Sequence, residues 1–133
     1  MKIGELARRT GFSAHTLRYY EQIGLLPKIS KDTSGQRNYE LSALVWLGFV
    51  RKLRETGMPI REMVRYAELR NLGDGTASER KMILMAHRQE VQLQIELLQT
   101  HLLAIDEKVA FYTANYPDIE ENTNDQTSAR RSL

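Results

Sequence analysis

Apolar residues recur at helical spacing near the start of the chain and predict two short helices joined by a tight turn. In the first, over residues 2–9, the apolar side chains share one helical face. Ser13 can cap the second, because its hydroxyl can accept a hydrogen bond from an otherwise unpaired backbone N–H. Gly11 fits the turn, and Gly24 is expected to end the second helix. This layout predicts a helix-turn-helix over about residues 3–24.

The second predicted helix turns a polar face outward. Leu17 faces inward and Tyr20 lies on an adjoining face, which leaves four residues outward near the helix start: His15, Thr16, Arg18 and Tyr19. An outward arginine beside aromatic hydroxyls suits a DNA groove, because arginine can bridge guanine and a tyrosine hydroxyl can reach a phosphate oxygen. Taken alone, these residues favour an amphipathic helix with a solvated arginine, and the neighbouring stretches shift the balance to DNA.

Residues 28–40 predict a β-hairpin, the small wing that often follows a helix-turn-helix. A turn cluster occupies residues 32–35, and residues 36–39 can pair with residues 28–30. A wing that grips phosphate is favoured over a solvated surface hairpin because of the preceding helices. Its expected lining residues are Lys28, Lys31, Arg37 and Tyr39.

Two more helices are predicted over residues 42–56 and 60–71, and they complete a DNA-binding domain over residues 1–72. The tight connection between them centres on Gly57 and Pro59, and Pro59 favours the first turn of the following helix. The inner side of the first of these helices is expected to hold Leu44, Leu47, Gly48 and Leu53. Its other faces are expected to hold Trp46, Phe49 and Arg54.

A hinge over residues 73–78 precedes a long predicted helix over residues 79–113, and a flexible polar tail over residues 114–133 follows. The long helix carries a heptad seam of Leu84, Val91, Ile95, Leu98, Leu102, Ile105, Val109 and Tyr112. Burial of one leucine is worth roughly 1.5–3 kcal/mol, so an exposed seam strongly favours a partner helix. The alternative, packing on the chain's own N-terminal domain, would not cover the whole seam. We therefore expect a coiled-coil homodimer.

Composition narrows the class of protein. A chain of 133 residues has room for a small domain and a long helix. Residues 1–70 carry a charge balance of +6 and residues 71–133 one of −4, which suggests that only the front half touches a polyanion. The chain has no cysteine, which removes thiolate metal sites and thiol-based sensing. It also has neither a membrane-length apolar run nor a signal pattern, so we expect a cytoplasmic protein.

An enzyme fits the sequence poorly. The three histidines, His15, His87 and His101, are scattered, and no cluster of nucleophile, base and orienting group is visible. His87 and His101 fit surface positions of the coiled coil better than metal ligands. We expect no catalytic residues, no metal site and no cofactor.

Taken together, five motifs resemble the MerR family of bacterial transcription regulators. They are Ile-Gly-Glu-Leu-Ala at 3–7, Leu-Arg-Tyr-Tyr-Glu at 17–21, Ile-Gly-Leu-Leu at 23–26, Gly-Gln-Arg-Asn-Tyr at 35–39 and Arg-Lys-Leu-Arg-Glu-Thr-Gly-Met at 51–58. The resemblance implies a mostly α-helical winged helix-turn-helix protein and a homodimer joined by an antiparallel coiled coil. It also implies that the dimer bends and untwists double-stranded promoter DNA whose spacer is too long, which makes RNA polymerase an indirect partner. Such distortion costs several kcal/mol, which phosphate contacts must offset.

The resemblance also suggests roles for individual positions. Arg18 corresponds to the base or phosphate reader of the second helix, with His15 and Thr16 beside it. Tyr19 and Tyr20 correspond to phosphate-contacting aromatic residues. The first wing is matched by Arg37 and Tyr39, and the second by Arg54 and the Gly57–Met58 backbone.

Within the family, residues 53–58 resemble the aldehyde- and electrophile-responsive (NmlR- and AdhR-like) subgroup. Many members of that subgroup carry a sensor cysteine just before this stretch, where this chain has Lys52. Thiol alkylation therefore cannot be the switch. Lys52 has three open roles: a solvated charge, a charge that touches phosphate or a partner-helix carboxylate, or a desolvated amine that forms a Schiff base with an aldehyde.

Two functions remain open at this point. The leading one is a sequence-specific regulator that distorts a long-spacer promoter as a homodimer and controls aldehyde, carbonyl or related stress genes. The alternative is an effector-independent architectural DNA-bending protein, which fits the missing sensor cysteine. A regulator would protect one promoter spacer, whereas an architectural protein would bind many sites with a modest specificity ratio.

Overall fold

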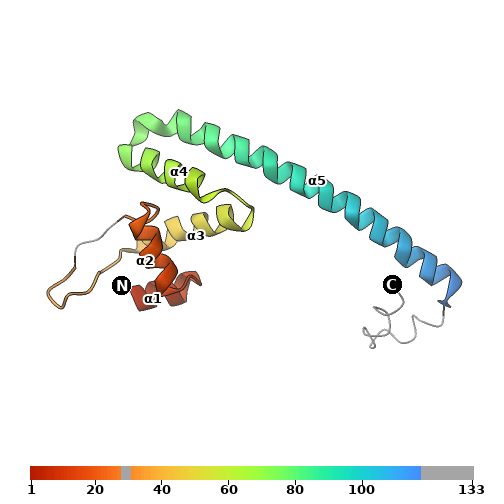
Figure 1. Cartoon of the computed structure of the whole chain (residues 1–133), viewed down its shortest axis with the longest axis horizontal. Coiled ribbons are helices and arrows are strands. Elements are labelled where there is room, and N and C mark those ends of the chain that lie inside the picture. The colour runs from red at the N-terminus through yellow and green to blue at the C-terminus, as the bar shows by residue number, and fades with distance from the viewer. Residues whose placement is uncertain (28–30, 118–133) are drawn as a thin grey trace. The chain divides into compact units, whose positions relative to one another are not determined.

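The computed structural model describes residues 1–27 and 31–117, and these are mostly helical, as the sequence predicts. Figure 1 shows the helices in chain order, with the long α5 last. The elements are α1 (Ile3–Thr10), α2 (Ala14–Gln22), α3 (Leu41–Glu55), α4 (Ile60–Leu72), the 3-10 turn η1 (Asp74–Thr76) and α5 (Ala77–Asn115). The chain divides into two compact units, residues 1–89 and 90–133, with the division inside α5. Most of the predicted tail, residues 118–133, lies outside the described residues.

The helix-turn-helix is confirmed, and local chemistry explains its boundaries. The Ser13 hydroxyl accepts a hydrogen bond from the Thr16 backbone N–H at 3.0 Å and so caps α2. Gly11 ends α1 in the left-handed conformation, with φ at 80°, where a residue with a side chain would be strained. Phe12 follows in the turn and packs edge-to-face on Tyr20, with the ring centroids 5.4 Å apart. These contacts fix the angle at which α2 leaves α1.

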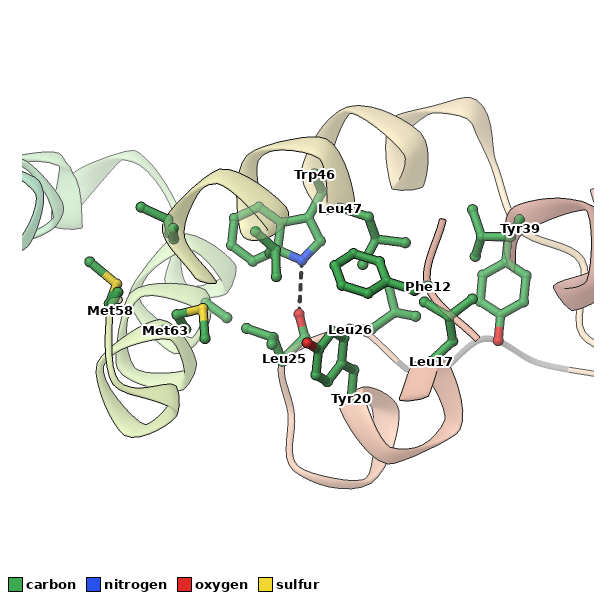
Figure 2. Packing of buried hydrophobic residues seen from close by; sticks show 14 of the residues in the cluster. Phe12, Leu17, Tyr20, Leu25, Leu26, Tyr39, Trp46, Leu47, Met58 and Met63 are labelled. Carbon is green, nitrogen blue, oxygen red and sulfur yellow. Dashed lines mark hydrogen bonds between the residues drawn. The ribbon is translucent and has the colours of Figure 1, made fainter. Parts of the chain in front are cut away.

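The core of the first unit is an apolar cluster to which α1, α2, α3 and α4 all contribute (Figure 2). The prediction for α3 is wrong at two positions, because Trp46 is buried and Gly48 is exposed. The Trp46 indole N–H donates a hydrogen bond to the Leu25 carbonyl at 2.8 Å, and its ring stacks on Tyr66 of α4. α3 is thus covered on two sides, by the segment after α2 and by α4, and it buries a wider face than a single apolar stripe predicts.

The predicted two-stranded wing is not formed as strands within the described residues. A single antiparallel bridge joins Lys31 to Arg37, and residues 28–30 lie outside the described part of the chain. Asp32 organises the turn instead, because its carboxylate accepts the backbone N–H groups of Ser34 at 2.9 Å and Gln36 at 3.1 Å. Beyond the bridge, the Tyr39 N–H donates to the Met1 carbonyl rather than to a wing strand.

The second unit contains the rest of α5, and this helix exposes much of its predicted seam. Leu98 is 67% exposed and Leu102 is 55% exposed, far above the values for the core leucines of the first unit. Three further seam residues are also exposed: Ile95, Ile105 and Val109. Val91 and Tyr112 are partly exposed, and Leu84 packs against the core of the first unit. None of the described helices is long and apolar enough to cross a membrane.

Candidate nucleic-acid interface

The outward face of α2 carries the side chains that the sequence assigns to DNA. His15, Arg18 and Tyr19 are exposed, and Thr16 is partly exposed. The Thr16 hydroxyl accepts a hydrogen bond from the Ser13 hydroxyl at 2.9 Å, so it belongs to the helix cap as well as to this surface. Arg18 and Tyr19 are therefore the freest groups on α2 to meet a base edge or a phosphate.

An open groove of about 320 Å³ lies beside Arg18, and cations from separate parts of the first unit line it. They are Lys2 before α1, Arg18 on α2, and Lys31 and Arg37 on the wing. Lys2 forms an ion pair with Asp32, which ties the start of the chain to the wing turn. Cations gathered this closely from three segments form a surface that favours a polyanion such as the DNA backbone.

A buried carboxylate lies behind this groove. Glu21 on α2 is 4% exposed, and one of its oxygens lies 2.8 Å from Nε of Arg37. The Tyr39 hydroxyl donates a hydrogen bond to the other oxygen. Burial, together with the hydrogen bond and negative charge of Glu21, raises the pKa of Tyr39 well above its usual value, although the Arg37 and Arg18 charges oppose the shift. The tyrosine therefore stays protonated, and Glu21 joins the recognition helix to the wing.

The second connection predicted to meet DNA is the turn between α3 and α4. Arg54 is exposed at the end of α3, and Gly57 has a φ of 92°, the left-handed value that glycine favours. Met58 is buried, and its backbone N–H donates to the Leu53 carbonyl at 2.9 Å. Thr56 lies just before this turn and contacts His87 of α5. The turn is therefore held on one side by the core and on the other by α5.

The structure gathers most of the predicted DNA-binding residues in the first unit but buries two of the tyrosines. Tyr20 is 1% exposed, and its hydroxyl accepts a hydrogen bond from Nη1 of Arg54 at 3.3 Å. Tyr39 is 2% exposed and bonds to Glu21. Direct phosphate contact by these two residues stays a prediction, and their visible role is to orient Arg54 and the wing. Lys28 lies outside the described residues.

Sequence reasoning missed two residues of this surface. Lys2 lines the groove, but its place follows from the fold of the wing rather than from a local pattern. Glu21 stands in the quoted Leu-Arg-Tyr-Tyr-Glu motif without a role of its own, and the distant positions of its partners hid its function. The signal that could have found it is an acidic residue predicted on the inner side of an otherwise basic element. Over residues 1–27 and 31–117, no group of three His, Asp or Glu side chains is placed to hold a metal.

Comparison with known families assigns both units. Residues 1–69 match the model of the MerR HTH family regulatory proteins, and residues 44–110 match a second model described as MerR, DNA binding. The chain belongs to the MerR family of transcription regulators. This MerR-family chain is therefore a DNA-binding transcription regulator, as its motifs predict, and its lack of cysteine sets it apart from members that sense through a thiol.

Two curated relatives share more than a third of their aligned residues with this MerR-family chain. An HTH-type transcriptional regulator of Haemophilus influenzae is 37% identical over 106 residues, which cover 80% of this chain and 78% of the relative. The regulator AdhR of Bacillus subtilis is 37% identical over 91 residues, which cover 68% of this chain and 65% of AdhR. Both are transcription regulators, so similarity supports a regulator rather than an enzyme.

Solved structures agree with this assignment. A MerR family transcriptional regulator from Listeria monocytogenes has a TM-score of 0.82 at 32% identity, with 98% of each chain covered. HiNmlR, described as a MerR family regulator lacking the sensor domain and bound to promoter DNA, has a TM-score of 0.76 at 34% identity. That alignment covers 85% of this chain and 90% of HiNmlR. The fold of the helix-turn-helix and the long last helix is thus shared with proteins of the same family.

Proposed function

We propose that this chain acts as a homodimer on a promoter with an overlong spacer, where it bends and untwists the DNA so that RNA polymerase engages. Under this proposal each protomer places α2 in a major groove, and the wing and the α3–α4 turn hold the flanking phosphates. The genes that it controls belong to the response to aldehydes, carbonyls or related stress. RNA polymerase is an indirect partner, reached through the shape of the DNA.

The observation that carries the proposal is the cationic groove beside the exposed face of α2. Arg18 projects from the helix, while Lys31 and Arg37 reach the same groove from the wing. Phosphate contacts on both sides of a reading helix fix its register, and they also supply the free energy that DNA distortion requires. A reading helix with phosphate-binding groups beside it is what a DNA-distorting regulator needs.

Homodimerisation is supported by the apolar residues that α5 exposes. Leu98 and Leu102 lie four residues apart on the seam, and each leaves more than half of its surface open to water in the single chain. Burial against a second copy would remove this cost for several residues in succession. Two half-sites on DNA then require two reading helices, and a symmetric dimer supplies them.

The proposed stress response rests on similarity to AdhR and HiNmlR, and not on a recognised sensor. The chain has no cysteine, and Lys52, at the position where the subgroup carries its thiol, is exposed on α3. A thiol-free signal or the level of the regulator itself would then set transcription. The alternative, an architectural protein that bends DNA without any effector, is favoured by this same missing thiol.

Footprinting on the region upstream of the chain's own gene distinguishes the two functions. A regulator should protect one promoter spacer at a concentration that leaves flanking DNA open, and Arg18→Ala should remove that protection. An architectural protein should cover many sites at similar concentrations. Protection that is uniform along the DNA, with no difference between wild type and Arg18→Ala, would count against the regulator.

A further inference from the structure

We propose that Glu21 is a positioning residue that holds Arg37 against the recognition helix and cancels its charge. In this arrangement the wing contributes placement on the correct DNA site rather than general attraction to DNA. The inference rests on the proposed function, since it assigns a specificity-determining role within the same interface. Its basis is the contact between a buried carboxylate on α2 and a guanidinium on the wing.

Two wing residues converge on the Glu21 carboxylate from one side. Tyr39 donates its hydroxyl to one oxygen, and Nε of Arg37 lies 2.8 Å from the other. The Arg37 Nε atom is buried, and its N–H is not aligned for a hydrogen bond, so the contact is an ion pair. Because Glu21 belongs to α2 and both partners belong to the wing, the carboxylate fixes the wing relative to the reading helix.

The remaining nitrogens of Arg37 are left for another partner. Within the described part of the chain, Glu21 is the ion-pair partner of Arg37, and that contact uses the Nε edge of the guanidinium. The Arg37 side chain is 32% exposed and lines the groove together with Arg18 and Lys31. Its terminal N–H groups can therefore bind a phosphate while the Nε edge stays fixed by Glu21, since a guanidinium carries five donors in a rigid fork.

A buried carboxylate needs a reason beyond stability. Removal of a charge from water is costly, and well-packed apolar residues often serve a core as well as a buried ion pair does. Glu21 faces the basic side of the molecule, where its negative charge also opposes DNA binding in general. A group that weakens general attraction and orders one arginine is suited to raise specificity, because specificity is a difference between two affinities.

The charge part of the proposal predicts the salt dependence of DNA binding. In wild type, the Glu21 charge offsets that of Arg37, so their sum is near zero. Glu21→Gln leaves the Arg37 charge uncompensated and should steepen the dependence of log affinity on log salt by about 0.9 for random-sequence duplex. Glu40→Gln is the matched control, because Glu40 is exposed beside Tyr39 and its loss removes the same charge without touching Arg37.

The positioning part predicts the ratio of specific to nonspecific affinity. Both affinities are measured by fluorescence anisotropy, with the footprinted promoter site and random-sequence duplex as the two probes. Glu21→Gln should lower the ratio by roughly tenfold, the scale of one displaced phosphate or base contact, while Glu40→Gln should keep it. Glu21→Asp keeps the charge but shortens the reach, so it should lower the ratio without changing the salt slope. Ratios equal to that of Glu40→Gln in both Glu21 variants would overturn the proposal.

A measurement on the unaltered protein keeps the proposal testable where a variant fails to fold. In solution NMR of the full chain, the buried Nε–H of Arg37 should exchange with water more slowly than that of exposed Arg18, with or without promoter DNA. Equal exchange would overturn the fixed pair. Failure of the proposed function looks different, because the wild type would then bind no promoter site more tightly than random duplex, whatever the exchange data show.

Discussion

The Thr56 hydroxyl oxygen lies 2.7 Å from Nε2 of His87, and this contact joins the α3–α4 turn to the early part of α5. The same hydroxyl donates to the Lys52 carbonyl at 2.7 Å. The turn that is proposed to meet phosphate is therefore tied to the helix that is proposed to dimerise. The contact lies within the first unit, so each protomer contains it whether or not a second copy is bound.

We predict that Thr56 and His87 are energetically coupled. The single variants Thr56→Val and His87→Ala should each destabilise the protein, and the double variant should be less destabilised than their sum by about 0.5–1.5 kcal/mol. Urea unfolding measures all four proteins of the cycle. Thr100→Val is the matched control, because the Thr100 hydroxyl also donates to a carbonyl four residues earlier, that of Glu96. A cycle with His87 that is additive for Thr56 as well as for Thr100 would contradict the coupling.

Tyr39 should make the protein lose stability at alkaline pH. Burial and the hydrogen bond to Glu21 raise its pKa in the folded state above the unfolded value of about 10. Below pH 10 both states keep the proton, so the stabilisation is complete. Above it, the unfolded chain loses the proton first, and the free energy of unfolding falls by up to about 1.4 kcal/mol per pH unit.

The measurement is the free energy of unfolding in urea between pH 8 and pH 11. Tyr39→Phe should be less stable than wild type near neutral pH but should show a shallower decline above pH 10. Tyr19→Phe serves as the control, since it removes an exposed hydroxyl from the same part of the fold. Parallel declines in wild type and Tyr39→Phe would show that another group causes the alkaline loss.

The local parts of this structure could be predicted from the sequence, because their causes lie a few residues apart. The Ser13 cap depends on Thr16, and the end of α1 depends on the left-handed Gly11. Leu17 is buried where the helical spacing places it. Patterns of this range are visible in one sequence without any knowledge of tertiary contacts.

The parts that could not be predicted depend on contacts across the chain. Trp46 is buried because the Leu25 carbonyl accepts its N–H from 21 residues away. Glu21 and Tyr39 are 18 residues apart in sequence and meet only after the wing folds back on α2. Periodicity gives each helix one inner face, and it does not report that α3 is covered on two sides or that an acidic residue has buried partners.

The exposed seam of α5 predicts that charged residues there separate the dimer. Replacement of Leu98 and Leu102 together by Glu should give monomers in sedimentation velocity, because four like charges would meet in the dimer seam. Operator binding should be lost with it. The control is the same replacement at Leu93 and Leu97, which are exposed on α5 but lie off the heptad seam. Dimers that survive in the seam variant, or dissociate equally in both, would contradict the proposed interface.

Lys52 is predicted to be an ordinary exposed charge and not a carbonyl sensor. An exposed amine stays protonated at neutral pH, and a protonated amine is a poor nucleophile. Formaldehyde or methylglyoxal followed by borohydride should therefore label Lys52 no faster than Lys81, which is exposed on α5. Mass spectrometry of the labelled peptides reports the ratio. Selective labelling of Lys52 together with an altered promoter response would instead make it a sensor that needs no thiol.

The central claim is that the dimer activates transcription by distorting an overlong promoter spacer. The most direct test is transcription in vitro with purified RNA polymerase on two templates, the natural promoter and one whose spacer is shortened by about two base pairs. The protein should increase transcript from the natural template, because bending and untwisting realign its two polymerase elements. It should give no increase on the shortened template, whose elements are aligned already. Equal stimulation of both templates, or no effect on either at saturating occupancy, would contradict the account.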